Sequence, residues 1–176
     1  MKETKPRIEL KNVKHMEALS EETHAYSATV YVDGKRWASV SNQGQGGPDS
    51  VYPLRNSKKT YTDIQAELKD LNKRISNTFD PLVDERYGGP PMKQDLELVC
   101  GELVNKYLYR KEFLRARRKY LMFTTSANPG VFQISRPAKD RIEHAKAAIS
   151  ARHIGETLQF LDDLSEEDAI ELFTTA

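Results

Sequence analysis

One continuous stretch, HAYSATVYVDGKRWASVSN (residues 24–42), constrains the fold of this chain more than any other part of it. Apolar residues in its first half occupy alternate positions, as in a strand with one buried face: Tyr26, Ala28, Val30 and Val32. Asp33-Gly34 follows, and a two-residue type I′ turn requires positive φ at both central residues, which this dipeptide tolerates. The run KRWASVSN then returns. The sequence therefore predicts an antiparallel hairpin with Gly34 at positive φ.

The residues before and after this hairpin predict an α+β fold. The run RIELKNVKHM (residues 7–16) alternates only as far as Leu10, which indicates a strand with a bulge. Residues 7–42 therefore form an antiparallel sheet of two or three strands. From Pro48 through Pro53 and RNSKK we expect no regular structure. Apolar spacings of three and four then predict a helix over residues 60–79, with Thr60 and Asp63 as a capping box.

The second half of the chain alternates between helices and short strands. A long helix over residues 93–119 carries one apolar stripe: Leu96, Val99, Leu103, Tyr107 and Leu114. Strands are predicted over residues 120–125, 131–135 and 157–161. Two further helices follow, one opened by Ser135 and Pro137 with Ile142, Ala145 and Ile149 inward, and a last one capped by Ser165 and Asp168. The loop DERYGGPPMKQD is the predicted hinge between an N-terminal part (1–86, sheet plus helix) and a C-terminal part (87–176), packed as one compact unit.

Composition excludes several classes of protein. Hydrophobic residues make up 38% and charged residues 30% of 176, which suits a folded domain rather than a disordered chain. The net charge of +1 favours no particular partner. One cysteine, Cys100, excludes an intrachain disulfide. The start lacks a signal-peptide pattern and no run is apolar enough to span a membrane, so we expect a soluble, cytoplasmic protein with no membrane partner.

The glycine loop GQGGP (residues 44–48) has two interpretations. Backbone amides of glycine-rich turns can bind a phosphate. A phosphate loop, however, leads directly into a helix and usually carries a lysine, and neither is present here. We therefore expect an exposed, mobile exit from the sheet that holds no phosphate. As a contact loop it would present Asn42, Gln43 and Gln45.

The second candidate is the basic run NKYLYRKEFLRARRKY (residues 105–120). Its cations are offset by Glu112 alone, and three tyrosines lie among them. Arginine beside aromatic residues suits phosphates and bases, or an acidic protein surface. The alternative is a solvated helix face with cations near the helix C-terminus. The candidate partner-binding residues are Lys106, Arg110, Lys111, Arg115, Arg117, Arg118 and Lys119.

The C-terminal segment is acidic, from Asp162 to Glu171. Acidic residues in a first helical turn complement the helix dipole. The alternative is that they are the charge partner of the basic helix, within the chain or in a dimer.

The sequence offers little support for a catalytic site. The four histidines have no metal-binding spacing, although the fold could still assemble two of them. Cys100 adjoins an apolar stripe and is expected to be packed rather than nucleophilic. The sequence predicts no catalytic residue, no cofactor and no metal site, and favours a non-enzymatic protein.

The stretch AYSATVYVDGKRWASVSNQGQGG resembles a family of small proteins found on phages and other mobile elements. The matching residues form a YVDGK turn and an N-x-G-x-G-G loop: Tyr31, Val32, Asp33, Gly34, Lys35, Asn42, Gly44, Gly46 and Gly47. The end, LQFLDDLSEEDAIELF, is similar to that family's closing segment. The resemblance assigns no residue a role. It implies an accessory protein of a phage or mobile element, acting in the host cytoplasm, where such proteins often inhibit host defence, as anti-CRISPR and antirestriction proteins do.

Three functional hypotheses follow. The first is a non-enzymatic protein that binds and inhibits a host protein or nucleoprotein complex through the basic helix and the glycine loop. The second is a nucleic-acid-binding accessory protein that uses the same helix. The third is an enzyme whose site is assembled across loops.

Overall fold

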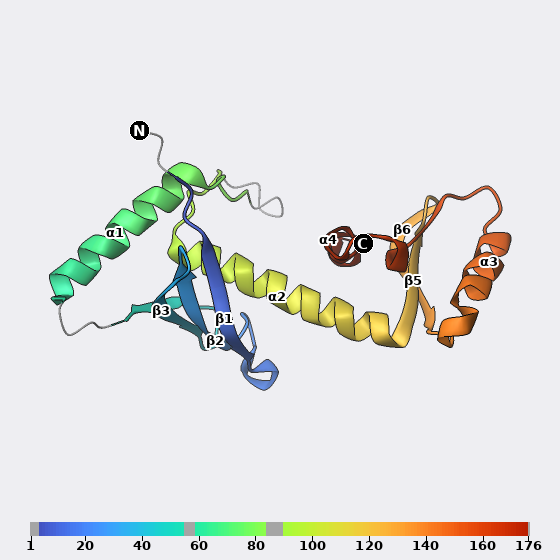
Figure 1. Cartoon of the computed structure of the whole chain (residues 1–176), viewed down its shortest axis with the longest axis horizontal. Coiled ribbons are helices and arrows are strands. Elements are labelled where there is room, and N and C mark those ends of the chain that lie inside the picture. Colours follow the sequence, from blue (N-terminus) through green and yellow to red (C-terminus); the bar gives the residue numbers. More distant parts are fainter. Residues whose placement is uncertain (1–3, 55–58, 84–89, 176) are drawn as a thin grey trace. The chain divides into compact units, whose positions relative to one another are not determined.

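The fold is described from a computed structural model, which covers residues 4–54, 59–83 and 90–175. The fold is α+β, as the sequence predicts, with an antiparallel N-terminal sheet, central helices, and a C-terminal sheet with helices (Figure 1). By its contacts the chain divides into two compact units, Met1–Asn105 and Lys106–Ala176. The division falls inside the long helix, and the predicted boundary after residue 86 stays a prediction. No helix in the described part of the chain has the length and apolar character that crossing a membrane requires.

The N-terminal unit contains a four-stranded antiparallel sheet in the order β1-β2-β3-β4. The strands are β1 (Ile8–His15), β2 (Tyr26–Val32), β3 (Lys35–Asn42) and β4 (Ser50–Pro53). The predicted hairpin is confirmed, because Val32 pairs with Lys35 across a turn in which Asp33 and Gly34 have φ of 51° and 78°. The predicted irregularity in β1 is also confirmed, between Lys11 and Lys14.

Strand β4 corrects the expectation of irregular structure between Pro48 and Pro53, and residues 55–58 of the same expectation lie outside the described residues. Its four residues pair with β3, from Ser50 opposite Ser41 to Pro53 opposite Ala38. Both prolines are compatible with this strand, because Pro48 precedes it and Pro53 ends it at the edge of the sheet. Proline lacks the N–H that a central strand must donate, and an edge position removes that requirement.

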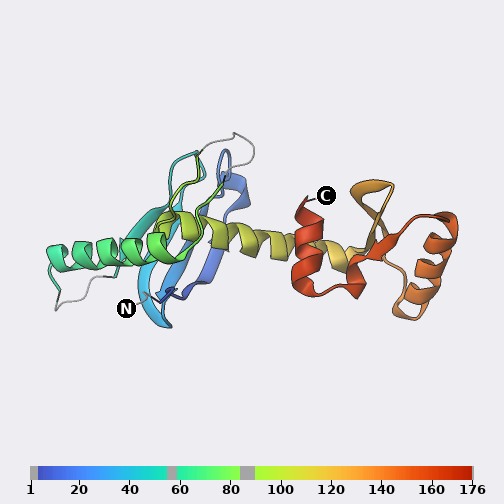
Figure 2. The ribbon, with the colours of Figure 1, turned by 90° about the horizontal axis from the view of Figure 1, so that it is seen from above.

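The core of the N-terminal unit lies between one face of this sheet and two helices, α1 (Tyr61–Thr78) and the beginning of α2 (Leu96–Lys119). Both ribbon views show the first turns of α2 beside the strands (Figures 1 and 2). The capping box at Thr60 and Asp63 forms as predicted. The buried apolar residues come from β2, β3 and the two helices: Tyr26, Ala28, Val30, Val32, Ala38, Val40, Leu71, Ile75, Leu96, Val99, Cys100 and Val104.

The C-terminal unit has a three-stranded antiparallel sheet in the order β6-β5-β7. The strands are β5 (Tyr120–Thr125), β6 (Asn128–Ser135) and β7 (Leu158–Phe160). Helices α3 (Ile142–Arg152) and α4 (Glu166–Thr175) lie on opposite sides of it (Figures 1 and 2). Three residues of α3 pack inward as predicted: Ile142, Ala145 and Ile149. The side of α4 contains Phe113, Met122 and Leu161.

One part of the predicted stripe on α2 is wrong. Tyr107 is 41% exposed, whereas Phe113 of the same helix is fully buried in the C-terminal unit. The prediction extended one period through the whole helix, but the first and second halves of α2 belong to different units. Part of the predicted hinge loop, residues 84–89, lies outside the described residues, while Leu82 and Met92 on either side form an antiparallel bridge.

Candidate functional site

All seven cations of the basic run lie on α2 or at its end, and helical geometry separates them into two rows. Residues three or four positions apart share a face of a helix. Arg110, Phe113 and Arg117 form one such row, which we call the inner row. Lys111, Arg115 and Arg118 form another, the outer row. The two rows have different surroundings, so the run is not one continuous basic patch.

The inner row pairs with the acidic C-terminal segment inside the same unit. Arg117 Nε donates to Asp162 Oδ1 at 3.1 Å, and Arg110 Nε donates to Glu166 Oε1 at 2.6 Å. The Arg117 guanidinium also lies 5.9 Å from the ring centre of Phe113, at the margin of the core. This arrangement confirms that the acidic segment is a charge partner of the basic helix within the chain.

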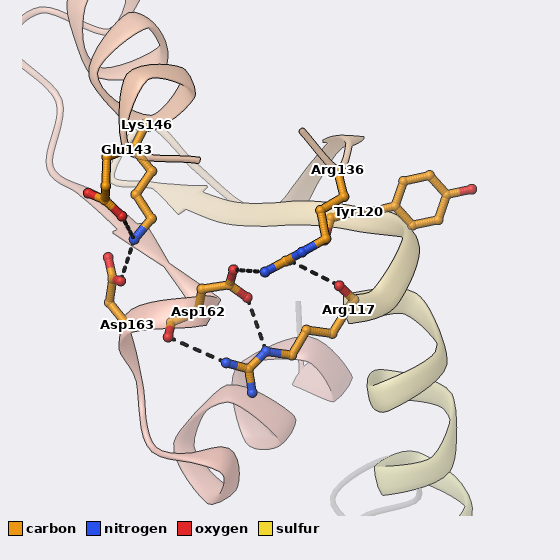
Figure 3. A network of polar contacts seen from close by, with 7 residues as sticks. All are labelled: Arg117, Tyr120, Arg136, Glu143, Lys146, Asp162 and Asp163. Carbon is orange, nitrogen blue, oxygen red and sulfur yellow. Dashed lines mark hydrogen bonds and ion pairs between the residues drawn. The ribbon is translucent and has the colours of Figure 1, made fainter. Parts of the chain in front are cut away.

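Asp162 is the centre of a larger network that the sequence did not reveal (Figure 3). Arg136 Nη2 donates to Asp162 Oδ2 at 2.5 Å, so one carboxylate accepts from two arginines. Arg136 Nη1 also donates to the carbonyl oxygens of Arg117 and Tyr120, at 3.0 and 3.1 Å. A cation here satisfies carbonyls where α2 passes into β5, because the last carbonyls of a helix lack partners within it. Asp162 is only 10% exposed, so the network is structural.

A second pair holds α3 to the same segment. Lys146 Nζ donates to Asp163 Oδ1 at 2.5 Å and lies 3.2 Å from Glu143 Oε1 (Figure 3). The hydrogen bond to Asp163 raises the pKa of Lys146, with Glu143 adding to the effect. Lys146 therefore stays protonated. It joins α3 to Asp163 in the segment before α4 and also pairs with Glu143 of its own helix.

The outer row is a solvent-exposed cationic face. Lys111, Arg115 and Arg118 are exposed, and within the residues that the structure describes none has a carboxylate at ion-pair distance. Tyr107, four positions before Lys111, extends the row with a ring that is 41% exposed. Lys106 and Lys119 are exposed as well, whereas Arg117 is half-buried and engaged by Asp162. The candidate surface therefore loses Arg117, and among the exposed cations the outer row shares one helix face with Tyr107.

The glycine loop is built into the N-terminal unit. The Gly44 carbonyl accepts from the N–H groups of Glu21, Glu22 and Thr23 at 3.0, 2.9 and 3.3 Å. The Gly44 N–H donates to Asn42 Oδ1 and the Gly46 N–H to Thr23 Oγ1, so two amides that a phosphate would require are already engaged. Gly44 itself is buried, which corrects the expectation of a fully exposed loop.

Of the three predicted contact residues in this loop, Asn42 is structural and the other two face solvent. Asn42 is 9% exposed and its side chain accepts from Thr23 Oγ1 and donates to Gly47 O and Asp49 Oδ1. Gln43 and Gln45 are exposed. Asn42 therefore holds the loop, and only the two glutamines are placed to meet a partner.

Several ionisable residues of the N-terminal unit are packed or lie beside one another. Cys100 is fully buried, and burial together with the nearby Asp49 carboxylate raises its pKa to about 12, so the thiol is packed as predicted. Burial and a hydrogen bond to Asp49 raise the pKa of Tyr26 above its ordinary value. The rings of His15 and His24 are 5.4 Å apart. In the described ranges, no three His, Cys, Asp or Glu side chains are grouped as a metal would require.

Comparison with other proteins adds no identification. Protein-family models, curated proteins and solved structures all gave no match to this chain.

Proposed function

We propose that this chain is a non-enzymatic binding protein that docks onto an acidic surface of a host protein or nucleoprotein complex and inhibits it. The contact surface is the outer row of α2 with Tyr107. The observation that carries the proposal is the division of one basic helix into arginines engaged by Asp162 and Glu166 and cations that face solvent. A helix needs no such unpaired row to fold, because the inner row already joins α2 to the C-terminal segment.

Tyr107 adds a second argument for contact. Tyrosine and arginine are enriched where proteins bind one another, since each combines a broad apolar surface with a polar group. An exposed tyrosine followed by Lys111 and Arg115 on one face offers both. The resemblance to phage and mobile-element proteins supports a host defence complex as the partner and the host cytoplasm as the place of action.

The test is capture of the partner from lysate of a bacterial host by the tagged full chain, compared between two matched variants. Lys111→Gln/Arg115→Gln removes two cations four residues apart on α2. Lys69→Gln/Lys73→Gln removes two exposed cations with the same spacing on α1. A protein retained by the wild type and the α1 variant but lost from the α2 variant supports the proposal. Identical captured proteins for all three chains contradict it.

Nucleic acid is the second candidate partner, because the same row alternates cations with an exposed aromatic ring. Titration with duplex DNA separates the two. Each phosphate contact contributes a slope of about 0.9 in log affinity against log salt, so the α2 double variant should lower the slope by about 1.8. If wild type and both variants bind duplex DNA alike, the outer row does not contact nucleic acid.

A further inference from the structure

The outer face of the N-terminal sheet is a second surface, independent of α2. Residues of β2 alternate strictly between buried and half-buried, with Ser27, Thr29 and Tyr31 on the face away from the core. The neighbouring strands contribute Ser39, Ser41, Ser50 and Tyr52, because directly paired residues of a sheet share a face. This set of side chains is polar and unusually rich in hydroxyl groups.

The register arranges these side chains in three rows across the strands. The first row runs from Lys14 through Ser27 and Ser41 to Ser50. The second runs from Lys11 through Thr29 and Ser39 to Tyr52. The third runs from Glu9 through Tyr31 to Arg36. Lysines therefore lie along the β1 side, hydroxyls in the middle, and an exposed tyrosine on the β4 side.

A shallow hollow of about 370 Å³ lies on this face. Its polar lining consists of Asn12, Lys14, Ser27, Thr29, Ser39 and Ser41. Within the described residues the hydroxyls of Ser27, Thr29 and Ser41 make no side-chain hydrogen bond to the protein. Half-buried hydroxyl groups without a protein partner are available to a ligand, since each can donate one hydrogen bond and accept two.

The charge of this face points to an anionic ligand. Lys11, Lys14 and Arg36 are exposed cations, while Glu9 is already paired with Arg7 at 2.6 Å. Lys11 Nζ lies over the ring of Tyr31, 4.4 Å from its centre. Tyr52 is 59% exposed on the second row.

We propose that this outer face binds single-stranded nucleic acid. The lysines and the hydroxyls of the hollow would contact phosphate and sugar oxygens, and Tyr52 would stack on a base. The four strands span about 14 Å, since neighbouring strands lie about 4.8 Å apart. Aromatic residues on four-stranded sheets of this width stack two or three bases in other single-strand binders.

The composition of the face favours this ligand over two others. Interfaces between proteins have an apolar centre, whereas the paired residues in the middle of this face are serine and threonine, with tyrosines beside them. Duplex DNA is read by a helix or a narrow ribbon inserted into its major groove, and a four-stranded face does not enter it. Single strands instead present bases and phosphates to an open surface.

The experiment measures fluorescence anisotropy of labelled twelve-nucleotide oligo(dT) and oligo(U) with the full chain. Binding is measured between 50 and 200 mM salt. Lys11→Gln/Lys14→Gln should bind at least about tenfold more weakly and lower the salt slope by about 1.4, because each contact with a single strand contributes about 0.7. Tyr52→Ala should weaken binding about tenfold through loss of one stacked base. Lys69→Gln/Lys73→Gln on α1 is the matched control and should bind like wild type.

Several results would overturn the proposal. These are no binding at 50 mM salt, unchanged affinity in both sheet variants, a loss confined to Lys111→Gln/Arg115→Gln, and equal or tighter binding of a hairpin duplex or of a polyglutamate peptide. Thermal melts of each variant show whether it is folded. Should the double lysine variant unfold, Tyr52→Ala decides, since the Tyr52 side chain is 59% exposed.

Discussion

Asp162 offers the sharpest test of how the C-terminal unit is stabilised. The change Asp162→Asn keeps the size of the side chain and removes its charge. Two arginines then lose their common anionic partner, with Arg117 33% and Arg136 25% exposed. Removing one member of a buried ion pair costs about 3–5 kcal/mol, whereas an exposed pair contributes about 0–1 kcal/mol.

The partial exposure of both guanidinium groups places Asp162→Asn between these limits. Each arginine can regain some hydration, so we expect a loss of about 2 kcal/mol in the free energy of unfolding. The matched control is Glu166→Gln, which breaks the Arg110 pair at a site where both side chains are about half exposed. That change should cost less than about 1 kcal/mol.

The assay is urea unfolding followed by far-ultraviolet circular dichroism, with the dependence on urea compared between variants. A lower midpoint at unchanged slope reports lost stability rather than an altered unfolded state. If Asp162→Asn destabilises the chain no more than Glu166→Gln, the network around Asp162 does not hold α2, β6 and the C-terminal segment together.

Three further predictions concern the N-terminal unit. Gly44→Ala should lower the free energy of unfolding by at least about 2 kcal/mol, because Gly44 has φ of 88° and an added Cβ would lie 2.1 Å from the Leu19 carbonyl oxygen. The control Gly47→Ala places its Cβ in open space and should be nearly neutral in the same urea experiment. Cys100 should resist iodoacetamide at pH 8 in the folded chain and react fully in urea, because the thiol is buried and its pKa is about 12; stoichiometric alkylation of the folded chain would contradict its packing. The backbone N–H of Thr60 lowers the pKa of Asp63 below its ordinary 3.8, so the carboxylate stabilises the folded state above that pH and the effect is lost as the pH falls through the folded pKa. The difference in Tm between wild type and Asp63→Asn should therefore be larger at pH 7 than at pH 3, and an equal difference at both would show that the charge does not stabilise the helix.

The sequence-based predictions are accurate where they depend on neighbouring residues and fail where they depend on residues far apart in the chain. The turn at Asp33-Gly34 and the capping box at Thr60 depend on residues within a few positions, and both form as predicted. At Ser165 the side chain accepts from the Asp168 N–H and donates to the Asp168 carboxylate, which is part of the predicted box. Strand β4 was missed because its four residues have no pattern of their own and are ordered by pairing with β3. The error at Tyr107 arose because periodicity describes one helix face, while the two halves of α2 pack in different units.

The candidate site shows the same limit. The basic residues could be placed on one helix from their spacing. Which of them pair with acidic residues could not be deduced, because Arg117 and its partner Asp162 are 45 positions apart in the sequence. Arg136 carried no signal beyond its place before a proline. The alternation of residues 26–32 predicted which side chains of β2 face away from the core, but the hydroxyl rows were not predicted, because they depend on the register between strands.

The most direct test of the outer row on α2 is the affinity of the purified chain for its captured partner, measured by biolayer interferometry near physiological salt. Lys111→Gln/Arg115→Gln should bind at least about tenfold more weakly than wild type with an unchanged melting temperature, because charged residues desolvated at an interface cost far more to remove than exposed ones. Lys69→Gln/Lys73→Gln should bind as wild type does. Equal affinity of all three chains would contradict the assignment of the outer row as the contact surface.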